Sequence, residues 1–465
     1  MTEVPARKSA RRYPAARANR ALRALAIGAV VLVGALSLLL VQPAPVSAAP
    51  EVTNPSVEMP DPASITFKAR LTADADIASA TVNYKILNPD GNIGGTLKAE
   101  VVGGRAVDAA VTLQTNNNDR YIPTGTQVTY SWTVTDKNGA STTSKEETIT
   151  FLDGRFQWLS KQEGRVSVYW YGASSANAEV AMRATLESIV HNEELLKVKL
   201  EYPVRVVVYR NSAEAKPAQR PRAATFDQQI VTGGSRVATD VLHIYDPLGG
   251  FEDVARHEAG HIVTKVAGDG KVSTLPSWID EGTAVYSQKS VGGYGPALQR
   301  AIQTDQLLRI RNMAAPSNQP SQVDIFYGQS WAVVKFIIDK HGKDKFAAIF
   351  KSVKDGAPID DALQTNIGMD QDGLYNAWRV SVGLKAIDFP PVPKSTSIAG
   401  SQATQPPLGI PTSVTSAANT DGTGGGVSSA PGAVVSTTTA AVVGGGTLLV
   451  AAALGFFAMR MMKKS

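Results

Sequence analysis

Two histidines four residues apart, His257 and His261, fall in a stretch whose pattern predicts an α-helix. Residues at this spacing lie on one face of a helix, so both imidazoles can reach one metal ion. Glu258 projects beside them, where its carboxylate can polarise a metal-bound water. Glu281 follows on a second predicted helix. A third ligand from there would complete a His/His/Glu set with one open position, which is the ligand count of a catalytic zinc site.

The stretch from Phe251 to Tyr286 resembles the gluzincin metallopeptidases, and more closely the peptidase MA-like domains of bacterial surface proteins. These families pair an HExxH helix with a second helix that carries Trp-x-x-Glu-Gly. The resemblance extends over residues 155–389, and it implies a peptidase domain that binds one catalytic Zn²⁺ ion. The positions that match the two motifs are His257, Glu258, His261, Trp278, Glu281 and Gly282.

The resemblance also implies a role for individual side chains. His257, His261 and Glu281 are the expected metal ligands. Glu258 is the expected general base, which takes a proton from the attacking water and returns it to the leaving amine. Gluzincins often stabilise the oxyanion with a tyrosine or histidine from a later helix, and Tyr327 is the candidate here. The alternative for Tyr327 is an aromatic residue packed in the core.

Other polar residues allow more than one interpretation. Asp280 precedes the third ligand, and it either orients a ligand imidazole or is a solvated surface acid. In gluzincins the last strand before the metal helix lies at the cleft edge and pairs with extended peptide, which makes Val241–Tyr245 the candidate edge strand. His243 on this strand can then face the cleft. His191 and His341 belong to other predicted helices and are expected to be structural.

Charge is unevenly distributed along the 465 residues. Segment 1–48 carries a net charge of +6 and segment 460–465 carries +3, which leaves −4 between them although the whole chain is +5. The pI of about 9.1 therefore reflects the two ends and does not predict a nucleic-acid surface. The chain has no cysteines, which excludes disulfides, cysteine-ligated metals and a thiol nucleophile.

Residues 1–49 predict an export segment. The run 21–41 is apolar apart from Arg23, and small residues near Ala48 and Ala49 offer a cleavage site, so we expect a signal peptide. An uncleaved N-terminal anchor is the alternative, since about 18 apolar residues can span a bilayer. Either segment would place the residues that follow outside the cytoplasm.

Residues 50–154 predict an all-β domain. Apolar and polar residues alternate from Ile65 to Leu71 and from Val128 to Val134, and turn sequences such as Asn-Pro-Asp-Gly at 88–91 separate such runs. Several short strands in about 100 residues predict an immunoglobulin-like sandwich. No catalytic cluster occurs in it, so it is either a spacer or packing domain, or an adhesion or substrate-binding module.

Residues 155–390 predict a gluzincin-like peptidase domain of the α+β class, with strands early and helices late. We expect a connection at 153–164, and we expect loops at 211–238 and 310–325 to shape the cleft. The expected strands are 166–171, 204–209 and 241–245, and the expected helices are 175–196, 252–266, a helix from Pro276 that carries Trp278 and Glu281, 328–340, 343–353 and 373–382.

The C-terminal part predicts a membrane anchor. Residues 391–438 are rich in Ser, Thr, Pro and Gly, as in a disordered linker. The segment 439–459 is long and apolar enough for a transmembrane helix, with a buried core helix as the alternative. The basic tail 460–465 is expected to be cytoplasmic, which places both folded domains outside.

Together these features predict a multidomain cell-membrane protein: an N-terminal immunoglobulin-like sandwich, a gluzincin-like α+β domain and a C-terminal transmembrane helix. The expected function is an extracytoplasmic zinc metallopeptidase acting on peptide or protein substrates, without nucleic-acid binding. The alternatives are an inactive surface binding or adhesion protein on a peptidase fold, and a zinc hydrolase of non-peptide amides. The sequence predicts neither an oligomeric state nor a cleavage specificity.

Overall fold

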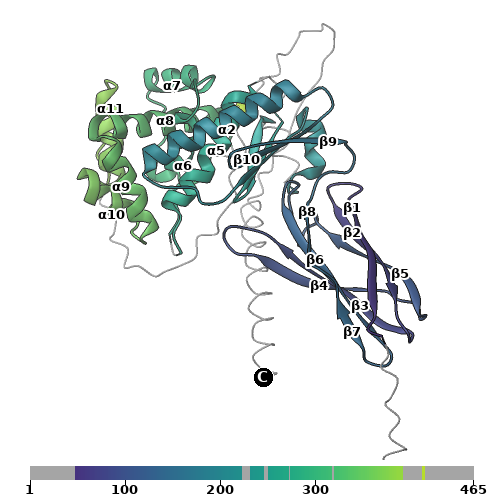
Figure 1. Cartoon of the computed structure of the whole chain (residues 1–465). Helices are drawn as coiled ribbons and strands as arrows, with labels where there is room; N and C mark the ends of the chain where they lie inside the picture. The colour runs from purple at the N-terminus through teal and green to yellow at the C-terminus, as the bar shows by residue number, and fades with distance from the viewer. Residues whose placement is uncertain are drawn as a thin grey trace, which may run out of the picture. The chain divides into compact units, whose positions relative to one another are not determined.

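The structure is a computed structural model that describes residues 48–221, 231–245, 250–271, 273–316, 319–390 and 411–413. Almost all of the predicted export segment, most of the predicted linker and the predicted transmembrane helix lie outside these residues. Among the described residues, none of the helices combines the length and the apolar character needed to cross a membrane. The described chain forms an N-terminal β-sheet domain followed by an α+β domain (Figure 1).

The first domain, called the β-domain below, consists of antiparallel strands in two sheets that share one core. Its strands are β1 (Glu51–Glu58), β2 (Ser64–Thr72), β3 (Ile77–Ile86), β4 (Ile93–Ala99), β5 (Ala106–Gln114), β6 (Gln127–Asp136), β7 (Ser141–Thr143) and β8 (Glu147–Thr150). One sheet has the order β1-β2-β5, and the other has the order β4-β3-β6-β7 with β8 also paired to β6. Alternate residues such as Ile65 and Phe67 of β2 share a buried core with Trp132 of β6.

The α+β domain contains one mixed sheet. Its strands are β9 (Trp158–Glu163), β10 (Val166–Tyr171), β11 (Val204–Val208), β13 (Gly234–Ala238) and β14 (Val241–Ile244), in the order β13-β14-β11-β10-β9. The three central strands are parallel, whereas β9 and β13 at the edges are antiparallel to their neighbours. All five residues of β11 are buried, as its continuous apolar sequence predicts for a strand covered on both faces.

Most helices come after the strands in the chain, and α2 and α5 pack on the sheet. The longer ones are α2 (Ser175–Leu196), α5 (Phe251–Gly268), α6 (Ser277–Tyr286), α7 (Tyr294–Gln303), α8 (Pro320–His341), α9 (Lys343–Lys354), α10 (Ile359–Ile367) and α11 (Gln371–Ser381). The shorter elements are α3 (Ser212–Ala215), two 3₁₀ turns (Lys216–Ala218 and Ile310–Asn312), and the paired strands β12 (Val231–Thr232) and β15 (Pro411–Ser413).

Several elements differ from the sequence-based expectations, and helices α7 and α10 were not predicted at all. The expected connection at 153–164 contains strand β9, which is mostly exposed and so has no alternating apolar signal. The expected loop at 211–238 contains strand β13, whose sequence Gly-Ser-Arg-Val-Ala also lacks alternation. Helix α8 begins at Pro320 and not at 328. Proline is tolerated in the first turn of a helix, so it does not prevent a helix from starting there.

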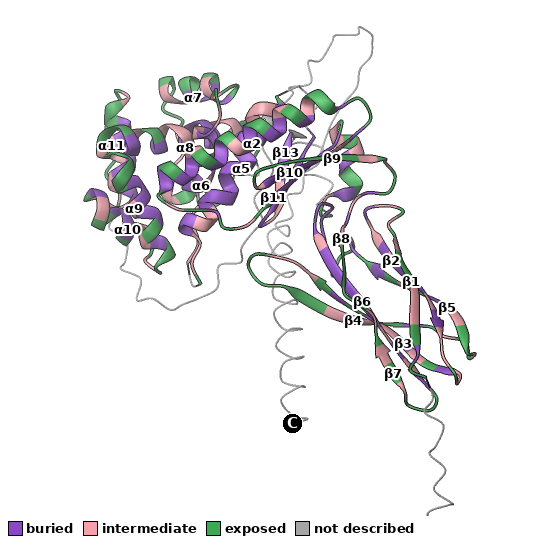
Figure 2. Ribbon diagram, in the orientation of Figure 1, coloured by how far each residue is buried: buried purple, intermediate pink, exposed green. Residues whose placement is uncertain are grey.

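Helix α5 lies in the centre of the α+β domain, where it packs against α2, α6, α9 and β13. Every residue from Val254 to Thr264 is buried, and Figure 2 shows this helix as buried while the outer faces of α9 and α10 are exposed. Four of these buried residues, Arg256, His257, Glu258 and His261, are ionisable. Buried polar groups need partners, so the interior of the domain must supply them.

The β-domain and the α+β domain share a buried interface. Arg205 of β11 donates from Nε to the carbonyl oxygen of Gly125 at 2.6 Å, and its guanidinium also pairs with Asp240. Gly125 has a φ of +94°, and a Cβ atom there would lie 2.8 Å from side-chain atoms of both Val207 and Val241. Only glycine fits this approach of the β-domain loop to β11 and β14.

Candidate metal centre

The metal-ligand candidates come from two helices that cross at close range. Helix α5 carries His257 and His261 one turn apart, and α6 carries Glu281. The helices approach closely at Gly260, where a Cβ atom would lie 3.2 Å from the Cα of Ala284. Gly282 lets α6 approach α8 in turn, since a Cβ there would lie 2.4 Å from the carbonyl oxygen of Ser330. Gly260 and Gly282, one in each motif, are therefore needed for the close packing of α5, α6 and α8 around the centre.

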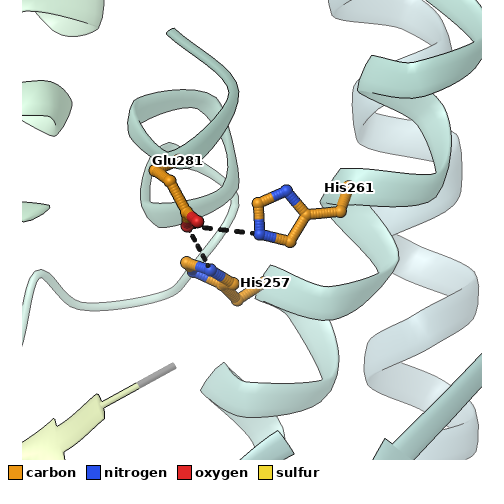
Figure 3. A group of neighbouring side chains, drawn as sticks. All are labelled: His257, His261 and Glu281. Carbon is orange, nitrogen blue, oxygen red and sulfur yellow. Dashed lines mark hydrogen bonds and ion pairs between the residues drawn. The ribbon is translucent and has the colours of Figure 1, made fainter. Parts of the chain in front are cut away.

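The three predicted ligands converge on one point. Nε2 of His257 lies 3.1 Å from Oε2 of Glu281, and Nε2 of His261 lies 3.3 Å from the same oxygen. All three side chains are buried, and their ligand atoms lie within 4.8 Å of one another. Figure 3 shows the Glu281 carboxylate turned toward both imidazoles. The structure thus brings together the three residues that the sequence singled out.

The arrangement fits a bound zinc ion. Two ligands of a tetrahedral zinc at about 2.0–2.1 Å from the metal lie about 3.3 Å apart, which matches both measured separations. Nε2 of His261 is buried and makes no hydrogen bond among the described residues besides its ion pair with Glu281, as expected of an atom that shares a metal with that carboxylate. Two neutral imidazoles and one carboxylate are also a donor set that zinc prefers.

The second nitrogen of each imidazole has a partner that fixes the ring. Asp280 Oδ1 accepts a hydrogen bond from Nδ1 of His261 at 2.9 Å, and Asp280 also accepts one from the hydroxyl of Thr264. Nδ1 of His257 lies 3.1 Å from the side-chain amide of Gln288. The hydrogen bond to Asp280 leaves Nε2 of His261 free for a metal. The atom of Gln288 nearest Nδ1 of His257 is the amide nitrogen, a donor; with the amide turned by 180°, its oxygen would accept from Nδ1–H and leave Nε2 of His257 free as well. Asp280 therefore holds the imidazole of His261 by a hydrogen bond and is not a solvated surface acid.

The electrostatics of the centre favour a cation. Burial lowers the pKa of His257 to about 4. Burial also opposes protonation of His261, but the charges of Asp280 and Glu281 outweigh it and raise the pKa of His261 well above its usual value. One buried carboxylate, Glu281, and one half-buried carboxylate, Asp280, thus concentrate negative charge on one imidazole. A divalent cation would neutralise these carboxylates in place of the proton on His261.

Glu258 lies next to this ligand set and is held by the edge strand of the sheet. Its side chain is fully buried, and its Oε2 accepts a hydrogen bond from the backbone N–H of Arg236 on β13 at 2.7 Å. Gly234 of the same strand packs closely on α5, since a Cβ there would lie 3.2 Å from Cγ of Glu258. Strand β13 therefore fixes the position of the predicted general base.

Tyr327 on α8 lies at the border of the centre. Its ring centroid is 6.2 Å from that of His257, and its ring stacks on Tyr294 of α7 at 5.2 Å. Burial, together with the charge of Glu281, raises the pKa of Tyr327 well above its usual value. Its hydroxyl therefore stays protonated and can donate a hydrogen bond near neutral pH. Tyr327 is both a buried aromatic residue and a neighbour of a ligand.

The prediction that Val241–Tyr245 is the edge strand was wrong. Strand β14, which contains His243, lies between β13 and β11, so the strand at the edge beside α5 is β13. His243 is fully buried, and its Nε2 lies 2.8 Å from the carbonyl oxygen of Thr124 in the β-domain. It therefore faces the domain interface and not the cleft. His191 and His341 are not members of the His/His/Glu cluster either.

Three residues of the centre were not predicted from the sequence: Arg236, Gln288 and Tyr294. Gln288 lies two residues beyond the end of α6, so helical spacing does not indicate it. Arg236 acts through its backbone, which its residue type does not reveal. Tyr294 follows two glycines without any recognisable motif.

A cleft of about 730 Å³ opens beside the centre. Asp280 and Glu281 line it from α6, and Arg236 to Ala238 line it from β13. The third ligand and the edge strand are therefore accessible from the same cleft.

Comparisons with known proteins address the α+β domain. Residues 184–383 match the model of a family described as the peptidase MA superfamily, and all the candidate ligands fall within this range. No curated protein matches the chain.

Two solved structures are similar to parts of the chain. One is described as the "Br derivative BhCBM56" (12% identity, 22% of this chain and 99% of that chain, TM-score 0.16). The other is the third fibronectin III domain of the human KIAA0343 protein (12% identity, 24% of this chain and 91% of that chain, TM-score 0.17). At these TM-scores neither likeness informs the fold. The match over residues 184–383 supports a gluzincin-type peptidase domain in this part of the chain.

Proposed function

We propose that this chain is a zinc metallopeptidase that hydrolyses peptide bonds. The observation that carries the proposal is the convergence of His257, His261 and Glu281 beside the buried carboxylate of Glu258. A single arrangement supplies three metal ligands, an acid–base group and an open cleft. These are the parts that peptide hydrolysis at a zinc site requires.

His257, His261 and Glu281 would hold the zinc ion. When bound, zinc supplies Lewis acidity, which lowers the pKa of a coordinated water and polarises a carbonyl group. Asp280 keeps the imidazole of His261 in the tautomer that leaves Nε2 free, and Gln288, with its amide oxygen turned toward Nδ1–H, would do the same for His257. Because these partners are in place before substrate binds, little reorganisation is needed during the reaction.

Glu258 would act as the general base and then as the general acid. It takes one proton from the attacking water as the C–O bond forms, and it delivers that proton to the amide nitrogen as the C–N bond breaks. The hydrogen bond from the Arg236 N–H stabilises its ionised form before the reaction. Tyr327, protonated near neutral pH, is the proposed hydrogen-bond donor to the oxygen that becomes negatively charged.

We propose that substrate binds as an extended strand along β13. This strand is the edge of the sheet, it lines the cleft, and its backbone contacts Glu258. A peptide that adds a strand to such an edge gains main-chain hydrogen bonds and reaches the metal position. The expected partner is therefore a peptide or protein chain, and no nucleic-acid partner is proposed.

The setting proposed for this enzyme is the outer face of a cell membrane. The support comes from the sequence: a signal peptide or anchor at 1–49, a Ser/Thr/Pro/Gly linker at 391–438, a transmembrane helix at 439–459 and a basic tail at 460–465. We also propose that the β-domain is immunoglobulin-like, since its two antiparallel sheets share one core in a domain of about 100 residues.

The substitution Glu258→Gln tests this function. We expect the variant to bind zinc like the wild type and to lose about 10²–10⁴-fold in peptide hydrolysis, since only the proton acceptor is removed. Glu252→Gln, in the first turn of the same helix, is the matched control and should stay active. A fully active Glu258→Gln variant would contradict the mechanism. Zinc binding without peptide hydrolysis by the wild type would favour an inactive binding protein or a hydrolase of other amides.

A further inference from the structure

The cleft beside the metal centre has walls from both domains. Its α+β wall includes Glu281 and β13, and its opposite part is formed by the β-domain. The β-domain contributes Ile86, the last residue of β3, Leu87, which follows it, and Ile93, the first residue of β4. These residues flank the turn that joins the two strands. The segment 86–93 is called the β3–β4 hairpin below.

The β3–β4 hairpin is attached to the elements that form the centre. Asp90 at its tip accepts a hydrogen bond from the hydroxyl of Thr239, which directly follows β13. The same carboxylate lies 3.4 Å from Nζ of Lys265 in the last turn of α5. One acidic residue of the β-domain is thus bound to both the edge strand and the metal helix. These contacts hold the hairpin over the cleft.

The turn itself is conformationally restricted. The N–H of Gly91 donates to the carbonyl oxygen of Asn88 at 2.9 Å, and the N–H of Asp90 donates to the Asn88 side chain at 2.9 Å. Gly91 has a φ of +130°, a conformation that only glycine adopts readily. A turn held in this way presents the flanking side chains in one orientation, which a selective wall requires.

The side chains that the hairpin presents are apolar. Ile93 is 62% exposed, and Ile86 and Leu87 are half-buried. The opposite side of the cleft adds Leu275 and Pro276 before α6. An apolar slot of this kind gains free energy when an apolar side chain of a ligand fills it, because all these surfaces leave water.

The distance along β13 indicates which part of a substrate would reach the hairpin. The catalytic Glu258 contacts the strand at Arg236, and the hairpin contacts it three residues later, at Thr239. Three residues of a strand span about 10 Å. A peptide paired antiparallel to β13, the slightly more stable geometry, places residues on the amino side of its scissile bond next to Thr239.

We propose that the β3–β4 hairpin is a specificity-determining wall of the peptide cleft. It selects substrates with an apolar side chain about two to four residues before the scissile bond. This inference rests on the proposed peptidase function. It assigns the β-domain a part in substrate recognition, in addition to its packing on β11 and β14.

The test compares two serine variants of the full chain on a peptide library randomised on both sides of the scissile bond. Ile93→Ser removes the exposed apolar group of the hairpin, and Val102→Ser changes a valine that is 88% exposed and outside the cleft wall. Zinc content and the thermal unfolding midpoint should equal those of the wild type in both variants. We expect Ile93→Ser to lower the preference for apolar over polar residues at these positions about tenfold in kcat/KM. Val102→Ser should leave the preference unchanged.

The possible results separate this inference from the function on which it rests. If the wild type cleaves peptides and Ile93→Ser retains the same residue preference, the hairpin is not a specificity wall, although the peptidase function stands. A preference lost only on the carboxyl side of the scissile bond would overturn the proposed peptide direction and the inference with it. If the zinc-loaded wild type cleaves no member of the library, the proposed function fails and the inference fails too.

Discussion

Asp280 and Glu281 are neighbours in the sequence, and they contact opposite nitrogens of one imidazole. Asp280 Oδ1 lies 2.9 Å from Nδ1 of His261, while Glu281 Oε2 lies 3.3 Å from its Nε2. The first carboxylate orients the ring, and the second shares the metal position with it. This single dipeptide on α6 therefore supplies both a proposed metal ligand and the partner that orients the imidazole of another.

Replacing Asp280 should weaken zinc binding without removing a ligand. In Asp280→Asn the partner of Nδ1 loses its charge, so His261 becomes less basic and less firmly oriented. We expect zinc affinity to fall about 10–100-fold, measured by competition with a chromogenic chelator. Asp339→Asn, at an exposed ion pair on α8, is the control and should bind zinc normally. Equal affinities in the two variants would show that Asp280 does not act on the metal site.

Gln288 offers a second test of ligand orientation, because its side chain lies 3.1 Å from Nδ1 of His257. Gln288→Ala removes the partner and should lower zinc affinity by a similar factor of about 10–100. Gln288→Glu places an acceptor-only group at Nδ1–H and should retain zinc affinity at least equal to that of the wild type, since a carboxylate accepts strongly from Nδ1–H. The same chelator competition measures both variants. An alanine variant as tight as the wild type would refute the orienting role.

Gly282 should be essential for packing. A methyl group at this position would lie 2.4 Å from the backbone oxygen of Ser330, so α6 and α8 would have to move apart. We expect Gly282→Ala to lower the free energy of unfolding by about 1–3 kcal/mol in urea titrations. Gly293→Ala is the matched control, because a Cβ there meets no atom within 4 Å. If both variants are equally stable, the close helix approach is not required.

His243 should make stability depend on pH. Burial lowers its pKa to about 4, and its ring contacts Thr124 and lies near Asp153. The pKa in the unfolded chain is about 6.5, so between these values the unfolded state binds more protons than the folded state. The free energy of unfolding is therefore unaffected above pH 6.5 and decreases as the pH falls toward 4, by at most about 3 kcal/mol.

The variant His243→Gln isolates this contribution. Glutamine can still donate to the Thr124 carbonyl, but it does not titrate. Urea unfolding between pH 4 and 7 should give a flatter profile for the variant than for the wild type, since the other titrating groups are common to both. Parallel profiles would show that His243 is not responsible for the acid sensitivity.

The parts of the site that local spacing determines could be predicted from the sequence. His257, His261 and Glu281 follow from helical periodicity and a known motif pair, and Asp280 is the direct neighbour of a ligand. The edge strand could not be predicted in this way, because β13 has no alternating pattern and its position depends on pairing with β14. His243 was misplaced for the same reason. Likewise, the approach of Asp90 to Lys265 joins residues far apart in the chain, and no local pattern reports such a contact.

The most direct test of the metal centre is the zinc content of the purified protein at a fixed free-zinc concentration, measured by atomic spectroscopy for the wild type and for Glu281→Ala. The geometry predicts one zinc ion per wild-type chain and strong loss of zinc in the variant, because three ligands converge and one is removed. A wild-type chain without zinc, or a Glu281→Ala chain that binds zinc as tightly as the wild type, would contradict the proposed centre.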